Sequence, residues 1–447
     1  MGRASGLLSR VMRVSARIEP HEMRAVWLSF LYFFLIMASY YVLRPIRDAM
    51  GTVYGADRLE HLFTATFFAT FLAAPIYAGV ASRMKLRNFL PWVYGFFLLN
   101  ILIFYALFES HPESRIVAAI FYVWLSVFNM FIISVFWSFM ADLYSRAQAK
   151  RLFGFVAAGG SLGAAIGPAI TTVLVKLVGT GTMLLVSAAG FGAAILVIRL
   201  LVREKERLRV AEREEAQPTR LDHRLGGNPF TGFGLLLRSP YLLLIAAFIL
   251  LLTWISTIVY FQQAELIARA FESREARTQA FAVVDLIVNI CAIAVQLFGT
   301  GRIVTRFGVT TGLVLNPLIM LAAFLLVALS PVLMMLLGVQ IVRRVAEYAI
   351  ARPSREMLFT VVDQESKYKA KNVLDTVVYR FGDLSAAWAQ TGLAAIGFGV
   401  AGVALFGAAV ATLWGAVAFL LGQRFERVKA VPGVGLTLKH TLTRTKV

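Results

Sequence analysis

Apolar runs of about 20 residues recur along the whole chain. Each run is long enough to cross the ~30 Å hydrocarbon layer of a bilayer as an α-helix. The runs lack the ten-residue alternation and regular turns that are typical of an outer-membrane barrel. Only 15% of the 447 residues are charged, against roughly 25% in an average soluble domain. The pattern predicts an all-α membrane protein.

Twelve spans are predicted from these runs. They lie at roughly 24–50, 60–82, 89–108, 115–141, 152–176, 181–201, 241–268, 279–300, 309–329, 331–351, 372–396 and 399–421. The formal net charge of +19 is concentrated in loops at one end of the spans, whereas the loops at the other end are short, mixed or acidic. This distribution predicts that both termini are cytoplasmic. A basic patch interleaved with aromatic residues on a soluble face is absent, so no nucleic-acid partner is expected.

A short repeat divides the chain into two halves. Residues 142–150 and 363–371 share the pattern D-x-x-S-x-x-x-A-K, and both follow the fourth span of their half. Two like-oriented six-span bundles form the parallel repeat of the major facilitator architecture, with substrate bound near the midplane between them. The predicted organisation is an amphipathic N-terminal segment 1–23, a bundle 24–201, a cytoplasmic linker 202–240, a bundle 241–421 and a basic tail 422–447.

Several spans contain ionisable residues, which are expensive in a bilayer and therefore face a partner or a wet cavity. Near the end of span 1, Arg44, Arg47 and Asp48 lie three and four positions apart and so share one helix face. Two guanidiniums offer forked donors to a carboxylate or phosphate, with Asp48 holding one of them. The alternative is an Arg–Asp pair that only fixes the end of the helix.

Other spans supply further candidates. In span 10, Arg343 can pair with Glu347, either for substrate binding or as a salt bridge that gates the cytoplasmic side. In span 7, Tyr260 and Gln263 share a face and could hydrogen-bond a ligand or a neighbouring helix. The predicted substrate-binding set is Arg44, Arg47, Asp48, Asn129, Tyr260, Gln263, Arg343, Arg344, Glu347 and Arg380.

Carboxylates inside spans could also carry a proton. Asp285 in span 8 and Asp375 and Asp383 in span 11 are the candidates, because desolvation favours the protonated form of an unpaired buried carboxyl. Arg380 lies three positions before Asp383, and a pair between them would be structural.

Glycines and cysteine have simpler interpretations. Gly159, Gly163 and Gly167 repeat every four residues in span 5 and predict a flat face for close helix packing. The single cysteine, Cys291, permits no internal disulfide, and the five histidines are too scattered for a metal site. No metal, cofactor or enzymatic constellation is therefore expected.

Three segments resemble the ATP/ADP antiporter family of plastids and intracellular bacteria. They are Leu43-Arg-Pro-Ile-Arg-Asp48, Asp363-Gln-Glu-Ser-Lys367 with the following Lys-Ala-Lys, and Lys150-Arg-Leu-Phe-Gly154. The resemblance implies a divergent bacterial member with a twelve-span, major-facilitator-like fold that exchanges nucleotides. The sequence differs where the family pattern leads us to expect a lysine, at Asp383, and lacks the family's glutamates near Leu125 and Val259. Another anionic or zwitterionic substrate therefore stays open.

The expected function is secondary transport of a small anionic solute, such as a nucleotide or another phosphorylated metabolite. We expect alternating access with counter-exchange, in the bacterial inner membrane, by a monomer. One alternative is a proton-coupled exporter of amphipathic compounds, in which the arginines are tied to Asp48, Glu347 and Asp383. The other is a membrane receptor or scaffold that binds partners through the 202–240 linker.

Overall fold

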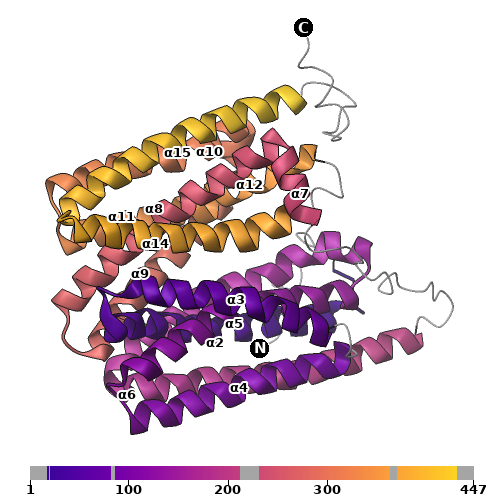
Figure 1. Cartoon of the computed structure of the whole chain (residues 1–447). Coiled ribbons are helices and arrows are strands. Elements are labelled where there is room, and N and C mark those ends of the chain that lie inside the picture. The colour runs from indigo at the N-terminus through magenta and orange to yellow at the C-terminus, as the bar shows by residue number, and fades with distance from the viewer. Residues whose placement is uncertain (1–17, 20, 82–85, 212–230, 363–369, 430–447) are drawn as a thin grey trace. The chain divides into compact units, whose positions relative to one another are not determined.

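The computed structural model describes residues 18–19, 21–81, 86–211, 231–362 and 370–429, and its regular elements are helices (Figure 1). Most of the N-terminal segment, the linker from 212 to 230 and the tail from 430 lie outside the described residues. In chain order the elements are α2 (Met23–Gly55), α3 (Leu59–Ala81), α4 (Leu86–Ser110), α5 (Arg115–Leu143), α6 (Arg146–Ala211), α7 (Thr231–Arg238), α8 (Pro240–Ala270), α9 (Arg274–Val295), η2 (Gln296–Thr300), α10 (Gly301–Leu329), α11 (Leu333–Ala346), η3 (Glu347–Ala351), α12 (Arg352–Met357), η4 (Leu358–Val361), η5 (Leu374–Val378), α14 (Tyr379–Ala395) and α15 (Val400–Lys429).

The helices follow the predicted spans closely. Within the described part of the chain, eight helices are long and apolar enough to cross a membrane. One of them, α6, holds two predicted spans and breaks at Gly179, where φ is 80°. That left-handed conformation suits glycine, which has no Cβ to clash with the backbone. The predicted loop at this point is thus reduced to a sharp break between two helical segments.

Helices α6 and α15 run furthest past their predicted ends. The sixth span was expected to end at 201, but α6 continues to Ala211, and α15 continues to Lys429 instead of ending at 421. Both extensions are rich in Arg, Glu and Lys, which are good helix formers in water. Hydropathy marks where the apolar stretch ends and does not report these polar turns.

The described residues form two compact units. Among the described residues, unit 1 takes those within 18–54, 72–211 and 272–286, and unit 2 takes those within 55–71, 231–271 and 287–429. The first part of α3 therefore belongs to unit 2, and the first part of α9 belongs to unit 1. Helices α3 and α9 thus each contribute residues to both units. The rest of the chain divides between the units at the linker.

In unit 1, α2 and α6 are in backbone contact through the predicted glycine face. A Cβ added at Gly159, Gly163 or Gly167 would lie 2.4, 2.4 and 2.5 Å from the carbonyl oxygens of residues 30, 34 and 38. The offset between the two helices is constant at 129 positions, so α2 and this part of α6 run parallel. The prediction of a packing face is confirmed, because no residue larger than glycine fits against those carbonyls.

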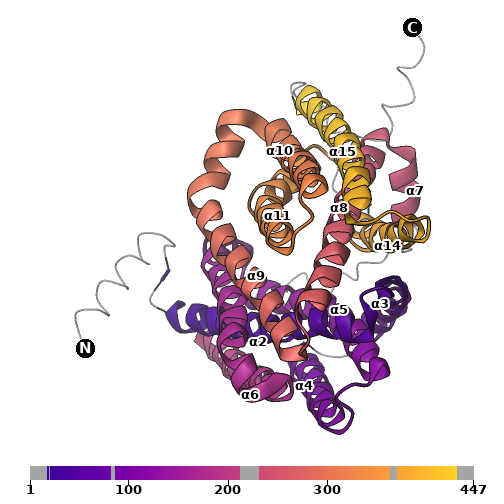
Figure 2. The ribbon, with the colours of Figure 1, turned by 90° about the vertical axis from the view of Figure 1, so that its left-hand side faces the viewer.

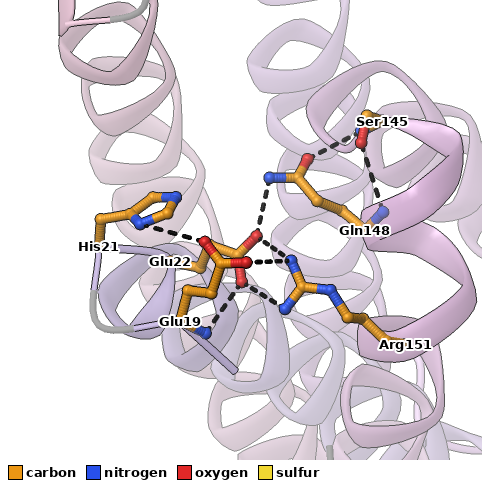
Figure 3. A network of polar contacts seen from close by, with 6 residues as sticks. All are labelled: Glu19, His21, Glu22, Ser145, Gln148 and Arg151. Carbon is orange, nitrogen blue, oxygen red and sulfur yellow. Dashed lines mark hydrogen bonds and ion pairs between the residues drawn. The ribbon is translucent and has the colours of Figure 1, made fainter. Parts of the chain in front are cut away.

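The start of α2 is tied to the start of α6 by a buried carboxylate (Figure 3). Arg151 donates to both oxygens of Glu22, at 2.9 and 2.6 Å, and Gln148 donates to Glu22 Oε1 at 2.9 Å. Burial raises the pKa of Glu22, but the hydrogen bonds from Arg151, the Glu19 N–H and Gln148 outweigh it, so the pKa lies below its ordinary value. Ser145 and Gln148 cap α6 reciprocally, with Gln148 Oε1 accepting from the Ser145 N–H at 2.9 Å.

In unit 2, α10 and α15 pack side by side along their lengths, as both ribbon views show (Figure 2). Gly407 and Gly422 of α15 face Phe324 and Thr310 of α10, so the two helices are antiparallel. Trp414 is fully buried between them and α8, where its ring lies 5.4 Å from that of Phe248. The hydrogen-bond network around Arg343 lies instead between α8 and α11, and α14 carries a further ion pair.

Candidate functional site

In unit 1, helices α2 and α9 form an antiparallel seam that carries charge. Arg44 Nε lies 3.7 Å from Asp285 Oδ2, and Arg277 Nη1 donates to Thr52 Oγ1 at 3.3 Å. Residue numbers across each contact add to 329, as expected for two antiparallel helices in one register. Asp285 is only 2% exposed. The seam thus brings together two residues predicted from sequence, Arg44 and Asp285, that are 241 positions apart.

Arg47 and Asp48 form the local pair expected within span 1. Arg47 Nε and Nη2 donate to Asp48 Oδ1 at 3.0 and 2.6 Å. The Arg47 guanidinium also lies over the Tyr122 ring of α5, at 5.2 Å from its centroid, and Arg44 lies over Tyr41 at 5.5 Å. A cation over an aromatic face is stabilised by the ring quadrupole. Tyrosine faces and carboxylates together hold both guanidiniums at the α2 surface.

In unit 2, Arg343 of α11 is buried at the centre of a polar network. It pairs with Glu347, with 3.0 Å between Nη1 and Oε2, and Nη1 also donates to Ser256 of α8 at 2.5 Å. Arg343 Nε donates to Gln340 Oε1 at 2.9 Å. The described hydrogen bonds of Arg343 use Nε and Nη1 and not Nη2. This arginine is therefore fixed in direction as well as in position.

Gln340 extends this hydrogen-bond network to a second residue of α8. Its Nε2 amino group donates to Gln263 Oε1 at 2.6 Å, and both side chains are at most 3% exposed. Gln263 therefore sits in a chain of hydrogen bonds that starts at Arg343. The neighbouring Gln262 instead donates to the Val400 carbonyl at 3.1 Å, which is a helix-packing contact.

A second ion pair lies on α14. Arg380 Nη1 is 3.5 Å from Asp383 Oδ2, and Thr257 of α8 donates to Asp383 Oδ1 at 3.3 Å. Asp375 lies in the π-helical turn η5, 3.8 Å from the Arg355 guanidinium. Both span-11 carboxylates that were predicted as proton carriers thus have an arginine beside them.

The remaining predicted residues are more scattered. Arg344 is buried and lies over the Tyr348 ring at 5.7 Å. Tyr260 packs its ring 5.9 Å from that of Phe63, and Asn129 is half-buried on α5. The structure thus gathers the candidates into two groups, one around Arg44 and Arg47 in unit 1 and one around Arg343 in unit 2.

Sequence reasoning missed three residues of these groups. Arg277 was taken as part of a loop before span 8, but α9 begins at Arg274 and carries it against α2. Ser256 and Thr257 gave no signal, because hydroxyl residues are common in membrane helices and their partners lie on other helices. The π-helical turn η3, which begins at Glu347, was also unpredicted, although such turns are frequent at functional sites.

One group outside these clusters has metal-ligand character. The side chains of Glu19, His21 and Glu22 place ligand atoms within 4.8 Å of one another. However, the Arg151 guanidinium lies against both carboxylates, 3.5 Å from Glu19 and 2.6 Å from Glu22. Since the cation already present neutralises Glu22, we assign this group to helix anchoring.

Comparison with known proteins gives a family match and distant relatives. Residues 28–356 match the family model described as the Major Facilitator Superfamily. The chain is 24% identical to ADP,ATP carrier protein 1 of Chlamydia trachomatis serovar D over 445 residues, which covers 84% of this chain and 83% of that protein.

Solved structures are similar in fold. A bacterial homologue of the human lysosomal transporter Spinster is 15% identical and has a TM-score of 0.59, over 93% of this chain and 100% of that one. The nucleoside transporter NupG is also 15% identical, with a TM-score of 0.55 over 92% and 100% of the two chains. At these identities the likeness concerns the fold alone, which is the twelve-helix architecture predicted from the repeat.

Proposed function

Because the chain belongs to the major facilitator superfamily, it is a multi-pass membrane transporter and not an enzyme, and we propose that it exchanges a small anionic solute by alternating access. The proposed substrate class is a nucleotide or another phosphorylated metabolite. The proposed location is the bacterial inner membrane, with both termini cytoplasmic.

The gathering of arginines inside spans, in both clusters, carries this proposal. The α2–α9 seam contains three arginines, Arg44, Arg47 and Arg277, together with the carboxylates of Asp48 and Asp285. The second cluster contains two arginines, Arg343 and Arg344, together with the carboxylate of Glu347. Each cluster thus holds at least two guanidiniums within one unit. A charge within a span costs about 2.5–3.5 kcal/mol on insertion scales, and an anionic substrate would offset part of that cost.

The ion pairs fit the same proposal. A carboxylate that neutralises an arginine between transport steps keeps the empty carrier from burying a bare charge. A phosphate offers the same forked acceptor geometry as that carboxylate, so it can replace Asp48 or Glu347 as the partner of a guanidinium. The distant similarity to a chlamydial ADP,ATP carrier supports nucleotides as the first substrates to try.

Proteoliposomes provide the test. Purified protein in vesicles loaded with ADP should take up labelled ATP or ADP, and uptake should fall when the internal nucleotide is omitted. Arg343→Gln and Arg44→Gln should each raise KM or abolish exchange. Failure to move any nucleotide, orthophosphate or phosphorylated sugar, together with uptake of neutral or cationic solutes, would overturn the anion assignment.

A second candidate is a proton-coupled exporter of amphipathic compounds. The specific observation that favours it is the set of pairs Arg47–Asp48, Arg343–Glu347 and Arg380–Asp383, since that function requires each arginine to be tied to a carboxylate. The two functions differ in their driving force. Exchange should continue when a protonophore collapses the proton gradient, whereas proton-coupled export should stop.

A further inference from the structure

The hydrogen-bond chain from Arg343 through Gln340 to Gln263 has a fixed direction. A guanidinium can only donate, so the Gln340 atom that meets Arg343 Nε must be the carbonyl oxygen. The other end of that carboxamide is then the amino group, which donates to the Gln263 oxygen. The charge on Arg343 thus sets the orientation of two amides in sequence.

This polarity decides what the site presents to a ligand. Within the described contacts, the oxygen of Gln263 is engaged and its Nε2 amino group is left to donate. Arg343 likewise keeps Nη2, because Nε is held by Gln340 and Nη1 by Ser256 and Glu347. The site therefore offers a cationic donor at one end and a neutral donor at the other.

Helix α8 sets the backbone separation of the residues beside the two donors. Arg343 is bonded to Ser256, and Gln263 lies seven residues further along that helix. Seven residues at the helical rise correspond to about 10 Å of backbone. The two donors best fit a ligand with an anionic group at one end and an uncharged hydrogen-bond acceptor several bonds away. Orthophosphate has no second part, and pyrophosphate offers there only another charged group.

We propose that Gln340 is a positioning residue that aims Arg343 at the anionic group and Gln263 at an uncharged acceptor of the same substrate. This inference rests on the proposed anion exchange and narrows it to anions that carry an acceptor-bearing ring or amide, the class to which nucleoside phosphates belong. Gln340 itself need not touch the substrate, since both of its polar atoms are used within the chain.

Exchange kinetics in proteoliposomes with ADP and with pyrophosphate test the proposal. Gln263→Met should raise KM for ADP about tenfold, the effect of losing one well-oriented hydrogen bond, and leave KM for pyrophosphate unchanged. Gln340→Met should raise KM for both, but more for ADP, with kcat little changed. In the double variant Gln263→Met/Gln340→Met, the ratio of KM for ADP to KM for pyrophosphate should be no higher than in Gln263→Met alone. Gln262→Met is the matched control, and its ADP-to-pyrophosphate KM ratio should equal that of the wild type.

The outcomes separate this inference from the function on which it rests. Equal KM increases for both probes in Gln340→Met would mean that Gln340 acts on Arg343 only. That result would overturn the proposed action of Gln340 on Gln263 and leave the proposed anion exchange intact. Additive effects of the two substitutions on the KM ratio would overturn the action on Gln263 as well. Wild-type protein that exchanges neither probe would overturn this inference, whereas the proposed function falls only if no nucleotide, orthophosphate or phosphorylated sugar is moved. Thermal unfolding of each variant identifies a folding defect, and Gln340→Asn, one methylene shorter, then replaces Gln340→Met.

Discussion

Arg44 and Asp285, which lie 241 positions apart in the chain, form an ion pair across the α2–α9 seam. Removing one partner leaves the other charge buried, which costs about 3–5 kcal/mol in proteins. Arg44→Gln and Asp285→Asn should therefore each lower the free energy of unfolding, while the double variant should recover most of that loss. Thermal unfolding in detergent measures the coupling.

The same cycle also separates structure from transport. If Arg44 binds substrate, the double variant recovers stability but not exchange. Full recovery of exchange in Arg44→Gln/Asp285→Asn would show that Arg44 only pairs with Asp285.

Gly163 is expected to tolerate no side chain. A Cβ there would lie 2.4 Å from the Phe34 carbonyl oxygen, so Gly163→Ala must push α2 and α6 apart, at a cost of about 1–3 kcal/mol. Gly154 on the same helix has no neighbouring atom within 4 Å of that position. Gly154→Ala should therefore be neutral or slightly stabilising, because alanine favours the helix by about 1 kcal/mol. Equal melting temperatures for the two variants would contradict the packing described for α2 and α6.

The Glu22–Arg151 contact predicts a stability that depends on pH. The pKa of Glu22 is lower in the folded chain than its ordinary value of 4.5, so folding favours the ionised carboxylate. Its contribution is complete above that ordinary value and is lost as the pH falls toward and through the folded pKa. The difference in melting temperature between wild type and Glu22→Gln should be large at neutral pH and shrink below about pH 4.5. A difference that stays constant down to acid pH would show that Glu22 does not stabilise the fold through its charge.

Glu347 should limit how strongly Arg343 attracts an anion. Glu347→Gln removes the carboxylate 3.0 Å from Arg343 Nη1 and so should lower KM for an anionic substrate severalfold. High salt should change this gain little, because the pair is largely buried and mobile ions screen buried charges only weakly. Glu265→Gln on α8 is the control, since Glu265 pairs with Arg269 at an exposed position. An unchanged or raised KM in Glu347→Gln, with the variant folded, would argue for a structural pair.

Much of the fold could be predicted because bilayer thickness constrains it. The apolar runs gave the spans within a few residues, and the short repeat indicated the family architecture. The pair Arg343–Glu347 was also predictable, since helix geometry brings residues four positions apart within reach, and Arg47–Asp48 joins direct neighbours in the sequence.

The long-range contacts could not be predicted in the same way. Nothing in the sequence near Asp285 indicates Arg44 as its partner, because the pairing depends on how α9 packs against α2. Arg277, Ser256 and Thr257 escaped notice for the same reason, since their significance comes from the helix opposite. The predicted role of Asp285 as a proton carrier remains a prediction.

Ser256 and Thr257 are adjacent on α8, yet they bond to different helices, Ser256 to Arg343 on α11 and Thr257 to Asp383 on α14. Successive residues of an α-helix point about 100° apart. Any turning of α8 about its own axis therefore moves both hydroxyls relative to their partners at the same time. The Arg343–Glu347 and Arg380–Asp383 pairs are thus linked through a single helix.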